Sequence, residues 1–185
     1  KHPQGIDLGP LQSTAPDRIP EEHGLIDLAP EMFVADLDRL QARFGSSTSG
    51  GQLRLIGRRH LRSNNSWMHN AARLMKGKER CTLMIHPEDA ERIGVKSGDM
   101  VCVTSRVGEV RAPADVTNDM MPGVVSLPHG FGHGRDGVQL RVATSHPGVS
   151  VNDLTDDQAL DVSGNAAFSG VPVTVEAAAG VAAAE

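Results

Sequence analysis

The chain has 185 residues, of which 39% are hydrophobic, 22% charged and 3% aromatic, with a formal net charge of −5. The apolar content argues against wholesale disorder, and without a run of about 20 apolar residues a transmembrane helix is excluded. Scarce aromatic rings disfavour base stacking on nucleic acid. Two cysteines, Cys81 and Cys102, form neither a disulfide framework nor a CxxC knuckle, which favours a reducing cytoplasm.

Residues 1–51 are predicted to form an extended connector arm with one short helix. The arm begins with neither a hydrophobic signal segment nor an initiator Met, which suggests a piece of a longer protein. A helix is expected after Pro30, because apolar residues from Met32 to Phe44 recur at helical spacing. The Ser/Gly run at 46–51 is a linker, so the packed domain should cover 52–176 and leave an Ala-rich tail at 177–185.

The packed domain is predicted to consist of short strands joined by tight turns. Strands are expected at 52–57, 81–85, 100–104, 110–116, 124–127 and 171–176. A short helix is expected at 88–93, because Pro87 suits its first turn and Gly94 its end. Both cysteines fall in apolar runs and are expected in the core. The fold class is therefore mainly β with short helices, as in a small β-barrel.

Positive charge is concentrated between residues 52 and 80, where Glu79 is the only acidic residue. The basic residues there are Arg54, Arg58, Arg59, Arg62, Arg73, Lys76, Lys78 and Arg80. A compact basic segment within an acidic protein indicates one anionic ligand or partner rather than a general nucleic-acid surface.

The strongest candidate site is the loop that follows the first predicted strand. Its candidate residues are Gly57, Arg58, Arg59, His60, Arg62, Ser63, Asn65, Ser66 and Trp67. Arginine matches phosphate and pyrophosphate with two parallel hydrogen bonds, while Ser and Asn add short polar groups and Trp a flat face. The alternative is a solvated basic loop.

Two later segments could also meet a ligand. Glycines around His129 and Gly130 permit close backbone approach, although a flexible surface loop is the alternative. His129 and His133 are four residues apart, but the glycines make a metal pair on a helix implausible. Asn152 and Asp153 could bind the N–H edge of a base such as guanine. The alternative is a structural role in an Asx-turn or a helix N-cap.

Signatures of independent catalysis are missing from the sequence. It contains no G-x-S-x-G elbow, no P-loop and no G-x-G-x-x-G that directly joins a predicted strand to a predicted helix. We therefore predict no catalytic residue and no metal ligand.

Four segments, taken in order, resemble the C-terminal molybdopterin-dinucleotide-binding domain of the molybdenum and tungsten oxidoreductases. This superfamily includes dimethyl-sulfoxide reductase, formate dehydrogenase and nitrate reductase. The matching segments are 57–67, 85–101, 122–130 and 151–155. Residues 2–11 are similar to the connector that precedes this domain in full-length enzymes.

The resemblance implies a double-psi β-barrel of the aspartate-decarboxylase-like type. Such a domain closes over a bis-molybdopterin guanine dinucleotide that other domains of the same polypeptide mainly hold. Residues 58–62 would meet pyrophosphate or pterin-side oxygens, the His129–Gly130 loop would also contact the cofactor, and Asn152 and Asp153 would meet its polar edges. Any iron–sulfur cluster and the metal ligand would lie in an earlier, missing part, so the fragment should be monomeric and not catalytic alone.

Two other functions stay open from the residues themselves. A stand-alone double-psi barrel could act as a binding or substrate-recognition module, because such barrels serve unrelated functions. A small hydrolase or decarboxylase is the third possibility.

Overall fold

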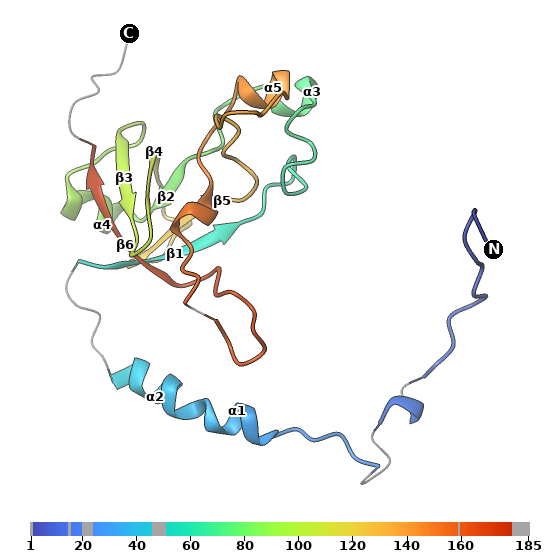
Figure 1. Ribbon diagram of the computed structural model, residues 1–185. Coiled ribbons are helices and arrows are strands. Elements are labelled where there is room, and N and C mark those ends of the chain that lie inside the picture. Colours follow the sequence, from blue (N-terminus) through green and yellow to red (C-terminus); the bar gives the residue numbers. More distant parts are fainter. Residues whose placement is uncertain (1, 15, 20–23, 46–50, 159, 179–185) are drawn as a thin grey trace. The chain divides into compact units, whose positions relative to one another are not determined.

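The computed structural model describes residues 2–14, 16–19, 24–45, 51–158 and 160–178 (Figure 1). Contacts between Cα atoms divide the chain into two compact units, Lys1–Gly45 and Ser46–Glu185. Among the described residues, no helix is both long and apolar enough to cross a membrane.

The first unit contains a 3₁₀ turn, η1 (Pro16–Arg18), and two consecutive helices, α1 (Glu31–Ala35) and α2 (Leu37–Gly45). The single helix expected after Pro30 is interrupted at Asp36, whose N–H bonds the Phe33 carbonyl and whose carboxylate accepts from Arg39 at 2.8 Å. The Asp36 N–H closes a tighter i→i−3 turn in place of the i→i−4 bond of an α-helix, which marks the break. The expected linker at 46–50 lies outside the described residues.

The second unit is a closed barrel of six strands. They are β1 (Leu53–Arg58), β2 (Leu83–Ile85), β3 (Met100–Thr104), β4 (Glu109–Val116), β5 (Val124–Pro128) and β6 (Val171–Ala177). The order around the barrel is β1-β5-β2-β4-β3-β6, with β1 parallel to β5 and β2 parallel to β4. The other four neighbouring pairs are antiparallel. Closure pairs every strand on both sides, so the barrel presents no open edge.

Alternating side chains fill the barrel interior. In β6, Val171, Val173 and Val175 are buried while Pro172 and Thr174 face outward, as a strand of period two requires. The same alternation buries the inward residues of β1, β3 and β4 in one hydrophobic core. The prediction of a mainly β barrel with short helices is confirmed.

Short helices connect the strands. They are α3 (Ala72–Met75), α4 (Pro87–Ile93), α5 (Arg141–Thr144) and the 3₁₀ helix η2 (Val151–Leu154). The ends expected for α4 are confirmed, because Pro87 occupies its first turn and Gly94 ends it in the left-handed conformation at φ 80°. Helices α3 and α5 lie side by side (Figure 1) over a second apolar cluster of Met75, Cys81 and Phe131.

The two cysteines have different surroundings. Cys81 is buried, as expected, and its Sγ accepts from the Val149 N–H at 3.2 Å. Cys102, also expected in the core, is only half-buried because it points outward between the inward residues Val101 and Val103 of β3. An apolar run therefore marks the strand correctly but not the face on which the thiol lies.

Asp89 joins helix α4 to the turn before β5. The residue is only 6% exposed, and its carboxylate accepts hydrogen bonds from the Gly123 N–H at 2.6 Å and from Arg92 at 2.7 Å. A buried carboxylate with two donors is stable as long as both donors remain.

We expect the substitution Asp89→Ala to lower the free energy of unfolding by about 2–3 kcal/mol, because a buried carboxylate that accepts from the half-buried Gly123 N–H and from Arg92 is lost. Urea denaturation measures the change. Glu91→Ala, at an exposed position of the same helix, is the control and should change stability by less than about 0.5 kcal/mol. Equal losses in both variants would contradict this role of Asp89.

Candidate functional site

The parallel pairing of β1 and β5 brings the two main candidate loops together. Arg58 ends β1 opposite Pro128, which ends β5. Parallel neighbours run in one direction, so the loops that follow them leave the barrel at the same end. The loop after β1 therefore meets the loop that begins at His129, whose N–H donates to the Arg58 carbonyl at 3.1 Å.

A hollow between these two loops forms the candidate site, which we call the basic cleft. It has a volume of about 310 Å³ and is lined by Arg59, His60, Ser63, Asn64, Asn65 and His129. None of these lining residues is acidic. Guanidinium, imidazole, amide and hydroxyl groups all donate hydrogen bonds, so the cleft suits the oxygens of a phosphate or another anion.

Glycines let the loops approach each other rather than a ligand. A Cβ at Gly57 would overlap the His129 ring, and a Cβ at Gly130 (φ 90°) would overlap the Asn65 carbonyl. Asn64 and Asn65 themselves adopt left-handed backbone angles, with φ of 42° and 58°. The close approach expected for Gly130 thus exists, but its partner is the protein backbone.

Arg58 and Arg59 point to different surroundings. The Arg58 guanidinium is turned into the protein and donates to the carbonyls of Ser126 (2.6 Å), Thr82 (2.8 Å) and Arg80 (3.2 Å). Burial lowers its pKa, a shift opposed by nearby Cys81 and Asp115. Arg59 is exposed, lines the basic cleft and donates to the Asn65 side chain. Arg58 therefore holds the loop, while Arg59 presents charge to the cleft.

A buried hydrogen-bond chain lies behind the cleft and was missed by sequence reasoning. His69 Nε2 lies 2.8 Å from Ser63 Oγ, and His69 Nδ1 lies 2.8 Å from His133 Nε2. All three side chains are buried. His69 carries no motif signal, and its partner His133 is 64 residues away, so only the fold brings them together.

The remaining residues of the first loop are exposed. Arg62, Ser66 and Trp67 do not line the basic cleft, and Trp67 is 85% exposed and Leu61 96%. These side chains therefore face the surface of the loop rather than the cleft.

The Asn152–Asp153 segment lies in η2 and outside the basic cleft. Both side chains are exposed, and the Asp153 carboxylate forms an ion pair with Arg135. The Asp153 carbonyl packs against Gly108, where a Cβ would overlap it. The structure therefore does not bring this pair to the same hollow as Arg59 and His129.

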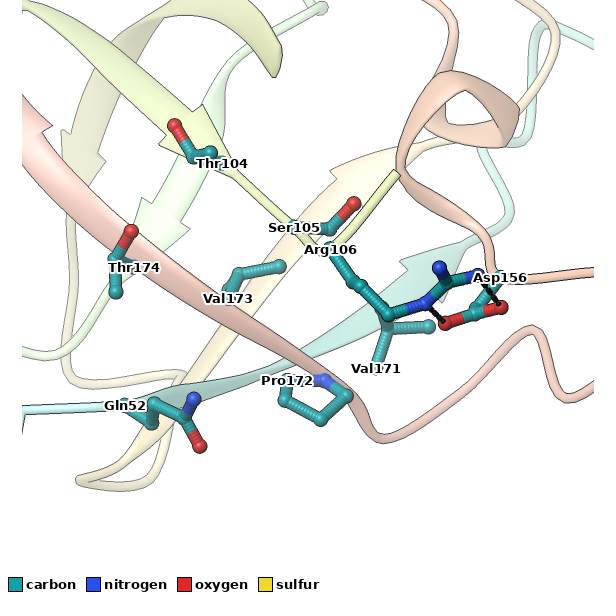
Figure 2. A pocket seen from close by; sticks show the side chains of 9 residues that line it. All are labelled: Gln52, Thr104, Ser105, Arg106, Asp156, Val171, Pro172, Val173 and Thr174. Carbon is teal, nitrogen blue, oxygen red and sulfur yellow. Dashed lines mark hydrogen bonds and ion pairs between the residues drawn. The ribbon is translucent and has the colours of Figure 1, made fainter. Parts of the chain in front are cut away.

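A second hollow, with a volume of about 440 Å³, lies beside β3 and β6 (Figure 2). Its lining residues are Gln52, Thr104, Ser105, Arg106, Asp156, Val171, Pro172, Val173 and Thr174. Its cation, Arg106, donates to the two carboxylate oxygens of Asp156 at 2.5 and 2.6 Å. Dashed lines in Figure 2 mark this pair. This bond is the largest cause that lowers the pKa of Asp156 to about 2. Because its charge is already neutralised, this hollow suits an anion less well than the basic cleft.

Metal binding has no support in the part of the chain that the structure describes. No group of three or more His, Cys, Asp or Glu side chains in that part could hold an ion.

The surroundings of Arg58 predict a structural effect of its removal. We expect Arg58→Ala to lower the free energy of unfolding by about 2–3 kcal/mol, because three carbonyls lose a charged donor. Arg58→Lys should not restore the lost stability, since an ammonium group cannot reproduce the planar set of donors of a guanidinium group. Arg59→Ala should stay within about 0.5 kcal/mol of wild type. A stable Arg58→Ala variant in thermal and urea denaturation would refute this role.

The histidines around the cleft predict a dependence of stability on pH. Burial is the largest cause that lowers the pKa of His60, His69, His129 and His133 below the ordinary value of 6.5. As pH falls through about 6.5, the unfolded chain takes up protons before the folded chain does, so the free energy of unfolding should decrease. Urea denaturation between about pH 7.5 and 5.5 measures this decrease. His133→Gln should reduce the slope, and a flat profile in wild type would contradict the prediction.

Comparison with known proteins places this geometry in a family. The model of the family described as "Molydopterin dinucleotide binding domain" matches residues 53–172. This span contains the basic cleft, the buried histidine chain and the Asn152–Asp153 segment.

Curated relatives are much longer than this chain. A tetrathionate reductase chain of Salmonella typhimurium is 31% identical, over 56% of this chain and 12% of its own length. The molybdopterin-containing ArrA chain of the arsenate respiratory reductase from Chrysiogenes arsenatis is 30% identical, over 62% of this chain and 12% of its own length. The chain therefore matches only about an eighth of each relative.

A solved structure confirms the fold. Acetylene hydratase from Pelobacter acetylenicus superimposes with a TM-score of 0.58 at 18% identity, covering 78% of this chain and 20% of that one. With the closed six-stranded barrel, this likeness confirms the expected double-psi β-barrel. Because the family model matches residues 53–172, well over half of the sequence, the chain belongs to the molybdopterin dinucleotide binding domain family.

Proposed function

We propose that this chain is the C-terminal domain of a molybdenum or tungsten oxidoreductase and forms one wall of a bis-molybdopterin guanine dinucleotide site. The observation that carries the proposal is the basic cleft, which lies within the span of the family match and has no acidic lining residue. Relatives named as reductases of tetrathionate and arsenate support an oxidoreductase as the parent enzyme.

The donor set of the cleft fits a dinucleotide cofactor. Its pyrophosphate oxygens accept hydrogen bonds and carry negative charge, and the cleft offers the Arg59 guanidinium, the His60 and His129 rings and the amides of Asn64 and Asn65. Arg59, Asn65 and His129 would hold this part of the cofactor. When bound, the cofactor supplies the redox chemistry at its metal, while this chain orients it.

Other predicted residues belong to the same proposal in different roles. Gly57, Arg58 and Gly130 hold the two loops together, as their contacts indicate. Arg62, Ser66 and Trp67 are exposed and would face the cofactor or the domains that hold it. Asn152 and Asp153 would contact a separate part of the cofactor, such as the guanine edge, because both are exposed outside the cleft.

The remainder of the parent enzyme follows from the same proposal. Its other domains are the partners of this chain, and they would supply the metal ligand and any iron–sulfur cluster. The division into an arm at 1–51, a barrel at 52–176 and a tail at 177–185 is part of the proposal, as is a monomeric isolated fragment. Two free thiols, Cys81 and Cys102, support a cytoplasmic enzyme.

The first test is the metal and pterin content of the full-length protein, made in a host that supplies the cofactor. We expect about one molybdenum or tungsten per chain by plasma mass spectrometry. A purified protein that contains no molybdenum and no tungsten would overturn the proposal and favour a stand-alone binding module.

The second test asks whether the basic cleft holds the cofactor. Arg59→Ala should weaken cofactor retention about tenfold or more, because one charge-assisted hydrogen bond to phosphate is lost. Arg73→Ala, at an exposed position in the same basic segment but outside the cleft, is the matched control. Equal pterin content of both purified variants after dialysis would exclude a role of Arg59 in cofactor binding.

A further inference from the structure

The buried chain Ser63–His69–His133 connects two segments that are far apart in the sequence. Ser63 and His69 belong to the loop after β1, and His133 belongs to the loop after β5. The two hydrogen bonds of 2.8 Å through the His69 ring connect these loops side chain to side chain behind the basic cleft.

The His69 ring is fully enclosed. Its exposure is 0%, its centroid lies 4.3 Å from that of Phe131, and its ring meets His133 edge-on at 5.1 Å. Phe131 belongs to the second apolar cluster, together with Met75 and Cys81. Both ring nitrogens of His69 therefore lie among protein atoms, with Ser63 and His133 as side-chain partners and the Gly130 backbone as a further contact.

Serine beside a histidine that touches a third polar group is also the pattern of an activated nucleophile. Here the Ser63 side chain is only 3% exposed, and the third group, His133, is buried as well. Although Ser63 borders the basic cleft, its hydroxyl lies 2.8 Å from the buried His69 ring and is almost closed to solvent, so it is suited to holding protein rather than to attack.

Elsewhere the two loops meet chiefly through close backbone packing. Gly130 packs on the Asn65 carbonyl, and Gly57 packs on the His129 ring. Asn64 and Asn65 adopt left-handed backbone angles that most residues avoid. Asn adopts this conformation more readily than most other residues, so the local sequence permits the turn that Gly130 packs against.

We propose that Ser63, His69 and His133 are positioning residues, which lock the loops of the basic cleft into one shape before any ligand arrives. His69 is the central member, because it contacts both partners. The link to cofactor binding rests on the proposed function, whereas the locking itself does not.

Hydrogen exchange of the full 185-residue chain without cofactor tests the locking. In the first loop the N–H groups of Met68 and His69 bond the Ser63 and Ser66 carbonyls, and in the second loop the N–H of Gly132 bonds the Pro147 carbonyl. His133→Ala and Ser63→Ala should each speed exchange in both loops by about tenfold or more, because a buried polar partner is lost. Peptides from β3 and β6 should change much less.

Two matched variants separate locking from general destabilisation. His133→Gln places an amide near the lost Nε2, so it should restore protection in both loops. Val103→Ala creates a cavity in the barrel core, outside the second apolar cluster, and should speed exchange in the strands rather than selectively in the loops.

Four results would overturn the locking role. Two concern His133→Ala alone: exchange rates that do not change in either loop, or that rise in only one loop. The other two are comparisons: the same exchange pattern in His133→Ala and Val103→Ala, or exchange in His133→Gln as fast as in His133→Ala. In the full-length protein, pterin content should fall several-fold in His133→Ala but not in Val103→Ala. Equal pterin content in the full-length His133→Ala and Val103→Ala variants would show that the locking does not affect the cofactor site. A wild-type protein without pterin would instead overturn the proposed function, while exchange would still decide the locking.

Discussion

The parallel alignment of β1 with β5 is the constraint on which the candidate site depends. It sets Arg58 opposite Pro128 and sends the following loops out at the same end of the barrel. Every later feature of the site follows from this register: the Gly57–His129 and Gly130–Asn65 approaches, the basic cleft and the His69–His133 hydrogen bond. A slip of one residue would turn the outward side chains inward and separate these partners.

The basic segment divides into charges that build the protein and charges that face outward. Arg58 donates its guanidinium hydrogens to three carbonyls from β5 and the segment before β2, so it joins strands that are distant in sequence. Its neighbour Arg59 points to the cleft. Adjacent residues at a strand end point to opposite sides, which lets one dipeptide both fasten the loop and supply its charge.

Local patterns predicted the elements well, because they depend on neighbours in the chain. Alternation marked β6, and Pro87 with Gly94 marked the ends of α4. The strand order could not be predicted from the residues alone, since β1 and β5 are far apart in the sequence and their pairing is a property of the whole barrel. For the same reason the sequence did not predict that Arg58 turns inward or that His69 contacts Ser63 and His133. It also did not predict that Asn152 and Asp153 lie outside the cleft.

Burial and charge together explain why this end of the barrel suits an anionic ligand. The cleft is lined by six residues of only two loops, yet its back is a chain of neutral groups rather than an ion pair. Four histidines there have a pKa lowered chiefly by burial, so near neutral pH the positive charge comes from arginine alone. Arginine keeps its charge at any physiological pH, whereas the uncharged histidines keep the loops in place. Separate residues thus provide shape and charge, while Trp67 and Leu61 of the same loop stay exposed on the surface of this chain.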